Sequence, residues 1–224
     1  MKNFIVKITK ILGVYSFLKK INIILQSKFG LGHGHNLFLF LIRKKIKQKN
    51  YKNFLEIGST REKIYGQGST EIIAKFCEKK KINFISVDAD ARNTVRLKEE
   101  LISYKYCKLI HDKGENYLKN IDIKFDCIYL DAFDIEKPIK NKFRDEFYLK
   151  EYSSTITNEM SADIHLEITK YLSEKVNKSA LIVFDDTFLN NNIFLGKGKK
   201  AIPFLINLGF KVTSSNSNSV ALER

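Results

Sequence analysis

Cysteine, proline and tryptophan are scarce in this sequence, and its first 55 residues contain no acidic side chain. The 224 residues include three Cys, two Pro and no Trp. Cys77, Cys107 and Cys127 are odd in number and widely spaced, and each lies in an apolar segment. This spacing excludes a disulfide framework and a cysteine metal site, so we interpret them as reduced core thiols of a cytoplasmic protein.

Long apolar runs are also missing. Lys7, Lys10, Lys19 and Lys20 interrupt the apolar N-terminal segment before it reaches the ~18 residues that a membrane span requires. Since no small-residue cleavage site follows, a signal peptide is not expected. The segment predicts an amphipathic helix. Its simpler role is packing against the core, and the alternative is peripheral contact with anionic lipid at the inner face of the membrane.

The excess of positive charge is confined to the N-terminal quarter. Residues 1–55 hold 12 Lys or Arg, and the remainder has 27 basic against 25 acidic residues. We therefore expect a basic N-terminal helical arm at 1–50 and one globular domain at 51–224. Within the arm, Gly30–Gly34 predicts a hinge before a second basic helix. His33 and His35 lie in it without further ligands nearby, which favours a flexible loop over a metal site.

Short apolar segments alternate with helical ones from residue 53 onward. Strands are predicted at 53–58, 83–90, 106–112, 125–134 and 179–186, and helices at 69–80, 91–104, 114–120, 163–176 and 200–210. Continuously apolar strands predict a parallel sheet covered on both faces. The extended segments 210–215 and 218–224 add an antiparallel hairpin. The predicted fold class is α/β, a doubly wound seven-stranded sheet preceded by N-terminal helices.

Acidic residues follow the predicted strands, where ligands of such sheets bind. They are Glu56, Asp88, Asp90, Asp112, Asp131, Asp134, Asp185 and Asp186. The stretch FLEIGSTREKIYGQGST also links the first strand to a helix through Gly58, Gly66 and Gly68. A helix that opens at Gly68 offers free N–H groups to an anion. Asp88, about 20 residues further on, can accept hydrogen bonds from ribose hydroxyls, which favours an adenosine ligand over an ordinary turn.

The segments LEIGS…GQGST, ISVDAD, HDKGENYL and FDCIYLDAFD, in this order, resemble the motifs of class I S-adenosylmethionine-dependent methyltransferases. The resemblance covers about residues 51–224 and includes the terminal hairpin. It implies a Rossmann-like fold and S-adenosyl-L-methionine as cofactor. It also implies a set of cofactor-binding residues: Glu56, Gly58 and Gly68 around the methionine part, Asp88 at the ribose, Asp112, Gly114 and Glu115 beside the adenine, and in addition Ser59, Ser69, Thr70, Ala89 and Asp131. The long segment STREKIYGQ leaves the contacts of Ser59 and Gly66 open.

The segments HLEITKYL, ALIVFDDTF and GKGKKAIPFLINLGFKV resemble a branch related to macrocin-type and catechol-type O-methyltransferases. In those relatives, an Asp after the fourth strand and an acidic or amide pair after the fifth coordinate a divalent metal. The matching residues are Asp131, Asp185 and Asp186, whose oxygens would suit Mg²⁺. In the alternative, Asp185 and Asp186 cap the following loop and Asp131 touches the cofactor. Asp134 replaces the lysine that serves catechol-type enzymes as a base.

Two residues are predicted to be catalytic. His165, near the start of a helix, is the candidate base because histidine titrates near neutral pH, and a structural role is its alternative. Asp131 is the second, at the end of the fourth strand. The long connection 135–162 predicts a lid or substrate wall. Phe147, Tyr148 and Tyr152, with Lys142 and Arg144, would line a site for a polar or anionic acceptor, and in the alternative they form the apolar side of a short solvated helix.

These features predict O-methylation of a sugar, glycan or other hydroxylated small molecule, with metal assistance as an open point. One alternative is an aminopropyltransferase-like enzyme, and another is an RNA- or membrane-binding protein that acts through its basic arm. Nucleic acid is not expected as a partner, because the arm is rich in Leu and Ile and lacks an RNA-binding motif. Homo-oligomerisation is left open.

Overall fold

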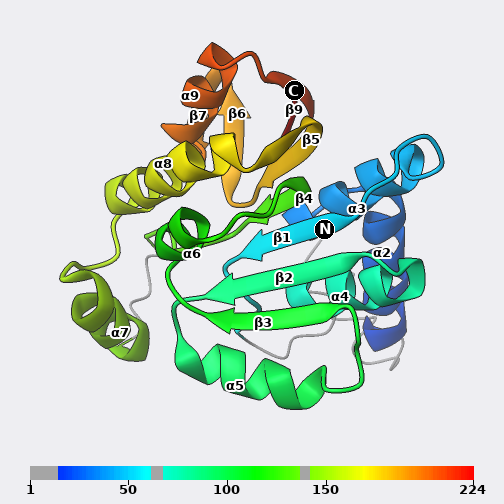
Figure 1. Cartoon of the computed structure of the whole chain (residues 1–224), viewed down its shortest axis with the longest axis horizontal. Helices are drawn as coiled ribbons and strands as arrows, with labels where there is room; N and C mark the ends of the chain where they lie inside the picture. The colour runs from blue at the N-terminus through cyan, green and yellow to red at the C-terminus, as the bar shows by residue number, and fades with distance from the viewer. Residues whose placement is uncertain (1–14, 62–67, 137–141) are drawn as a thin grey trace.

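The computed structural model describes residues 15–61, 68–136 and 142–224. Its main sheet has seven strands in the order β3-β2-β1-β4-β5-β9-β8 (Figure 1). The strands from β3 to β5 in this order are parallel, and β9 and β8 pair antiparallel with their neighbours. This topology confirms the predicted doubly wound α/β sheet that ends in an antiparallel hairpin. Gly66 and most of the segment STREKIYGQ lie outside the described residues.

The elements follow the predicted periodicity closely. The main-sheet strands are β1 (Asn53–Ile57), β2 (Asn83–Asp88), β3 (Cys107–His111), β4 (Phe125–Leu130), β5 (Val176–Phe184), β8 (Lys211–Ser215) and β9 (Val220–Glu223). The described helices are α2 (Tyr15–Phe29), α3 (Gly34–Lys45), α4 (Ser69–Lys80), α5 (Ala91–Glu100), α6 (Gly114–Asn120), α7 (Lys142–Tyr152), α8 (Asn158–Glu174) and α9 (Ala201–Asn207).

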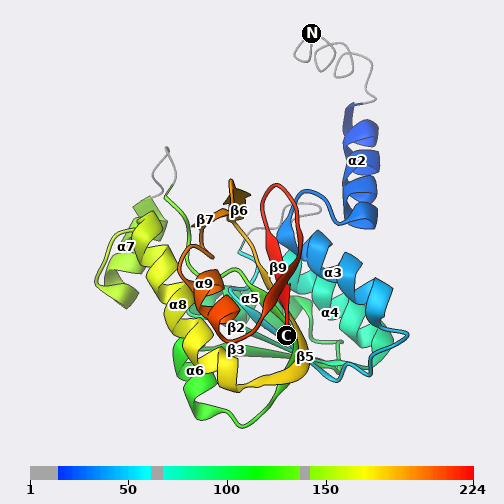
Figure 2. The same cartoon turned by 90° about the horizontal axis from the view of Figure 1, so that it is seen from above.

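Helices cover both faces of the sheet (Figure 2). On one face, α3, α4 and α5 pack against alternate strand residues such as Phe54 and Tyr129. On the other face, α6, α8 and α9 pack against the intervening residues, among them Leu55 and Ile128. Because successive strand residues point to opposite faces, both sets must be apolar, which explains the continuous apolar runs in the sequence.

The predicted arm contains two helices with different environments. In α3, Leu37, Phe38, Leu39 and Ile42 are buried in the core shared with α4 and the sheet. Helix α2 contacts α3 and exposes most of its apolar side chains to solvent. Residues 34–45 therefore form part of the packed core around the sheet.

A hairpin that the sequence prediction omitted follows β5. Strands β6 (Thr187–Asn190) and β7 (Ile193–Gly196) pair through the two-residue turn Asn191-Asn192, both residues of which have positive φ. Such turns match the natural twist of paired strands, and asparagine tolerates them well. Gly196 then passes so close to Asp186 that a Cβ atom would lie 2.1 Å from its carbonyl oxygen. The hairpin thus returns the chain to the end of β5.

Candidate functional site

A cavity of about 480 Å³ opens at the carboxyl ends of the central strands, at the end of the sheet toward α7 (Figure 1). This size is typical of small-molecule pockets. Ten of the residues predicted to bind cofactor or metal line it: Gly58, Ser59, Ser69, Asp88, Ala89, Gly114, Glu115, Asp131, Asp185 and Asp186. The cavity wall does not include the other predicted residues, Glu56, Gly68, Thr70, Asp112 and His165.

Gly58 lies where the chain leaves β1 between β2 and β4. Its N–H donates to the carbonyl of Val87 at 2.9 Å, and the N–H of Asp131 donates to the carbonyl of Ile57 at 2.8 Å. Gly58 has φ +96°, and a Cβ atom there would lie 2.2 Å from the Asp131 carbonyl oxygen. Only glycine lets the two backbones approach this closely at that dihedral angle. The crossing places the Asp131 side chain in the cavity wall.

Asp88, at the end of β2, is a buried carboxylate held by main-chain donors. It accepts the N–H groups of Ser59 and Asp90, each at 2.7 Å, and the Asn93 amide at 3.3 Å. Burial raises the pKa of Asp88, although these hydrogen bonds oppose the shift. The carboxylate is therefore fixed in orientation at the cavity wall.

Glu56 lies beneath the glycine-containing loop and is fully buried. One of its oxygens accepts hydrogen bonds from the hydroxyls of Thr70 at 2.7 Å and Ser86 at 2.6 Å. Burial raises the pKa of Glu56 to about 8. Thr70 and Thr60 also exchange hydrogen bonds at 2.8 and 3.0 Å. This network joins α4 to the loop after β1, so Glu56 and Thr70 support the wall from behind.

The third strand contributes through the start of α6. A Cβ atom on Gly114 would lie 2.5 Å from a methyl group of Ile57, so glycine lets α6 pack directly on β1. Glu115, beside it, lines the cavity, and its Oε2 is buried without a hydrogen-bond partner among the described residues. Burial raises the pKa of Glu115. Asp112 accepts a hydrogen bond from the N–H of Lys113 at 2.8 Å.

The three carboxylates predicted to bind metal do converge, and they surround a lysine. Lys197, which follows β7 directly, is 1% exposed. Its ammonium forms ion pairs with Asp131 and, at 3.1 Å, with Asp186. Burial alone would lower the pKa of Lys197, but the charges of Asp131, Asp186 and Asp185 raise it above its usual value. Lys197 is therefore a permanent cation at the centre of the group.

Asp185 has protein donors on both of its oxygens. One oxygen accepts the N–H of Gly34 at the start of α3, at 3.1 Å, and also the N–H of Asp186 at 3.0 Å. The other accepts the hydroxyl of Tyr129. A Cβ atom on Gly34 would lie 2.6 Å from the Asp185 carboxylate, so only glycine lets α3 approach. The N-terminal helix α3 thus forms part of the site.

These contacts do not fit the predicted Mg²⁺ site. Lys197 already supplies the positive charge between Asp131 and Asp186, and donors engage Asp185. Over the ranges that the structure describes, no group of three or more His, Cys, Asp or Glu residues is arranged to hold a metal ion.

The position of His165 does not fit the predicted general base. Its side chain is fully buried in α8, and its Nδ1 is 2.7 Å from the carbonyl oxygen of Ser161 one turn earlier. The ring packs near Phe184. Burial, together with the charge of Lys197, lowers the pKa of His165 to about 3. The histidine is therefore a neutral core residue, as the structural alternative proposed.

Helix α7 closes the far side of the cavity with aromatic side chains. Phe147, Tyr148 and Tyr152 line the wall, as the composition of the 135–162 segment predicted. The N–H of Asp134 donates to the Tyr148 hydroxyl at 3.1 Å, and Arg61 donates to the Asp134 carboxylate, at 2.6 Å for one of its two contacts. Burial would raise the pKa of Asp134, but the hydrogen bonds from Arg61 outweigh it and lower the value to about 2.

The sequence prediction missed Lys197 and the start of α3 as parts of the site. His33 and His35 both line the cavity, with their rings stacked 5.5 Å apart. The Asn36 amide donates to the carbonyl of Leu31 at 2.9 Å, which connects the start of α3 to the loop before it. The Asn-Asn turn between apolar residues was the available signal for the hairpin that positions Lys197.

No family model matches this sequence, and no curated protein matches it. Solved structures do share its fold. One is the N-methyltransferase NodS from Bradyrhizobium japonicum WM9 in complex with S-adenosyl-L-homocysteine, with a TM-score of 0.50, 10% identity and coverage of 85% of each chain. Another is the S-adenosylhomocysteine-bound methyltransferase PaMTH1 of Podospora anserina, with a TM-score of 0.52, 16% identity, and coverage of 84% of this chain and 76% of that one. The fold of this chain is therefore similar to that of methyltransferases.

Proposed function

We propose that this protein is an S-adenosylmethionine-dependent methyltransferase that acts on a hydroxyl group of a sugar or another hydroxylated small molecule. The observation that carries the proposal is the Asp88 carboxylate. It is held by main-chain donors at the wall of a cavity beyond the carboxyl ends of the strands. Ligands of doubly wound sheets bind at this edge, near the point where the strand order reverses.

The wall formed by β1, β2 and α6 fits an adenosyl ligand. Asp88 uses three contacts to protein donors, and a carboxylate offers about four lone-pair sites, so it retains acceptor capacity for ribose hydroxyls. Glu115 offers a buried acceptor without a partner among the described residues. A buried oxygen of this kind is costly unless a donor reaches it, which a bound ligand would provide. Gly58 and Ser59 would lie along the methionine part.

When bound, S-adenosylmethionine supplies an electrophilic methyl group on its sulfonium. The role of the protein is then to orient an acceptor hydroxyl and to remove its proton. Asp131 is the side chain placed to accept that proton, because it lines the cavity and is about 30% exposed. Burial and the charges of Asp185 and Asp186 raise the pKa of Asp131, although Lys197 opposes the shift. A raised pKa makes a carboxylate a stronger general base. Lys197 acts as a positioning residue.

The acceptor would occupy the part of the cavity between Asp131 and α7. Arg61 and Arg144 offer hydrogen-bond donors there, and Phe147 and Tyr148 offer ring faces. Polar groups around an aromatic surface suit a hydroxylated ring compound, with the rings excluding water and the polar groups fixing orientation.

The carboxylates of this region support an aminopropyltransferase that acts on a polyamine less well than they support a methyltransferase. Asp131 and Asp186 pair with Lys197, and Asp134 pairs with Arg61. These ion pairs leave less negative charge in this region for a cationic acceptor. Metal assistance does not form part of the proposal, because Lys197 lies between the carboxylates that a metal would need.

The test uses S-adenosylmethionine with a radiolabelled methyl group and small-molecule extracts of the source cells. We expect labelled product with wild type and with the exposed-residue control Glu99→Gln. For Asp131→Asn we expect a loss of about 10²–10⁴-fold, typical of a missing general base. The proposal would be abandoned if wild type transferred no label to any acceptor. Parallel reactions with decarboxylated S-adenosylmethionine would reveal aminopropyl transfer instead.

A further inference from the structure

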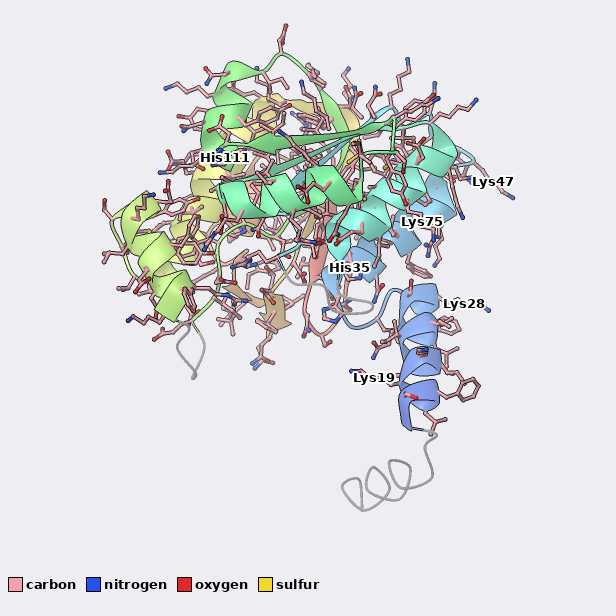
Figure 3. The ribbon with its side chains drawn as sticks, turned by 90° about the horizontal axis from the view of Figure 1, so that it is seen from below. Lys19, Lys28, His35, Lys47, Lys75 and His111 are labelled. Atoms are coloured by element: carbon pink, nitrogen blue, oxygen red, sulfur yellow. The ribbon has the colours of Figure 1, made fainter. Side chains whose placement is uncertain are left out.

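Helix α2 stands away from the rest of the molecule (Figures 2 and 3). Six of its apolar side chains are exposed to solvent, with relative exposures between 37% and 62%: Phe17, Leu18, Ile21, Ile24, Leu25 and Phe29. At 3.6 residues per turn, this spacing places them on one side of the helix. We call this side, made by those six residues, the apolar face of α2.

The apolar face of α2 points away from the body because the joint between α2 and α3 is fixed. Ile23, Gln26 and Ser27, on the opposite side of the helix, are half-buried. The N–H of Leu31 donates to the carbonyl of Gln26 at 2.9 Å. The Asn216 amide donates to the carbonyl of Gly30, also at 2.9 Å, which ties the joint to the β8–β9 turn. The side of α2 that carries Ile23, Gln26 and Ser27 is therefore turned inward, and the apolar face is turned outward.

Charge indicates what covers this face. The helix carries Lys19, Lys20 and Lys28 and no acidic residue, within a segment of 55 residues that has 12 basic side chains and no acid. A second copy of the helix would bring like charges together. RNA would meet aliphatic side chains on the exposed face, although basic and aromatic side chains are what it recognises. An anionic lipid surface satisfies both properties, since it attracts lysine and accepts apolar side chains.

We propose that α2 docks this protein on anionic membrane surfaces, with the helix lying in the plane of the interface and its apolar face inserted between lipid headgroups. Lys28, near the C-terminal end of the helix, lies on the same side as the apolar face and can extend its ammonium to phosphate groups, whereas Lys19 lies on the opposite side (Figure 3). Docking of this kind differs from spanning, and no helix within the described residues is long and apolar enough to cross a bilayer. The inference does not depend on the proposed methyl transfer.

The test is co-sedimentation of the full-length protein with vesicles of phosphatidylcholine alone or mixed with phosphatidylglycerol. We expect binding to the mixed vesicles that weakens as salt increases. The double variant Ile21→Asn/Ile24→Asn should reduce the partition coefficient by about tenfold or more, because both side chains leave the lipid. The matched control is Val95→Asn/Ile102→Asn, which removes two apolar side chains exposed elsewhere, on and just beyond α5, and should bind like wild type.

Substituting the lysines tests the electrostatic part separately. Lys20→Gln and Lys28→Gln should each weaken binding to mixed vesicles by about fivefold, and Lys19→Gln, on the opposite side of the helix, should weaken it less. All these positions are exposed, so the thermal midpoint should not change. Three results would overturn the proposal: no binding of wild type to mixed vesicles, equal binding by the Ile21→Asn/Ile24→Asn variant, or a dimer in light scattering that this variant dissociates. Tighter binding to an RNA oligonucleotide than to vesicles, unaffected by the isoleucine substitutions, would assign the arm to RNA instead.

Discussion

Replacing Lys197 by methionine removes a buried cation and leaves its carboxylate partners behind. The ammonium is 1% exposed and pairs with Asp131 and Asp186. Breaking a buried ion pair on one side typically costs roughly 3–5 kcal/mol. For a chain of this size, 1 kcal/mol corresponds to about 2–4 °C in the thermal midpoint. We therefore expect Lys197→Met to lower the midpoint by roughly 10 °C.

The loss should depend on pH in a defined direction. Without Lys197, the facing carboxylates repel each other, so their pKa values in the folded state rise above those of the unfolded chain. The folded variant then binds more protons than the unfolded chain, and its stability increases as pH falls through the raised pKa values. The destabilisation relative to wild type should thus be smaller at mildly acidic pH than at mildly alkaline pH.

The assay is thermal unfolding followed by circular dichroism at both pH values. The matched control is Lys199→Met, because Lys199 is 49% exposed and its ion pair with Glu159 lies at the surface. A surface pair of this kind contributes less than about 1 kcal/mol. Electron paramagnetic resonance with Mn²⁺ adds a second observable: Lys197→Met should bind the ion and wild type should not. Equal stability of the two variants, or Mn²⁺ binding by wild type, would refute the reasoning.

Two further predictions concern the crossing of the chain at β1 and the buried histidine. Gly58→Ala should destabilise the protein by more than about 2 kcal/mol, because it combines a positive φ with a clash against the Asp131 carbonyl. The control Gly209→Ala should destabilise the protein less, because Gly209 also has a positive φ, +89°, but no atom lies within 4 Å of the new Cβ. Denaturant unfolding measures both, and equal losses would contradict the clash. The pKa of His165 is about 3 in the folded state, against an ordinary value of 6.5. Between these two values the unfolded chain binds a proton that the folded protein does not bind. The free energy of unfolding should therefore decrease as pH falls from 6.5 toward 3, by up to about 5 kcal/mol. In His165→Gln, the stability should depend less on pH over this interval, and an unchanged dependence would show that the histidine is already protonated in the fold.

The sheet could be predicted from the sequence because its signal is local. Continuous apolar runs such as residues 127–130 require cover on both faces, and helical segments between them dictate parallel strands. The gathering of acidic side chains at one edge of the sheet could be predicted for the same reason, since parallel strands bring their carboxyl ends to the same edge. Ten of the predicted cofactor-binding and metal-binding residues accordingly line one cavity.

The ionic partners at that edge could not be predicted, because they depend on contacts between distant segments. Lys197 reaches Asp131 only through the β6–β7 hairpin, and Gly34 reaches Asp185 across 151 residues of sequence. His165 illustrates the opposite error. The sequence predicted it near a helix start, but α8 begins at Asn158 and His165 lies in the middle of the helix, where burial lowers its pKa. Sequence patterns identify the edge of the sheet, and packing decides which groups there are free to react.

The central claim is that the cavity at the ends of β1 and β2 holds an adenosyl ligand through Asp88. Isothermal titration calorimetry of the full-length protein with S-adenosyl-L-homocysteine tests it most directly. The account predicts saturable binding by wild type and a loss of about tenfold or more in Asp88→Ala, because the acceptor for the ribose hydroxyls is removed. Absence of any binding heat with wild type, or equal affinity in Asp88→Ala, would contradict it.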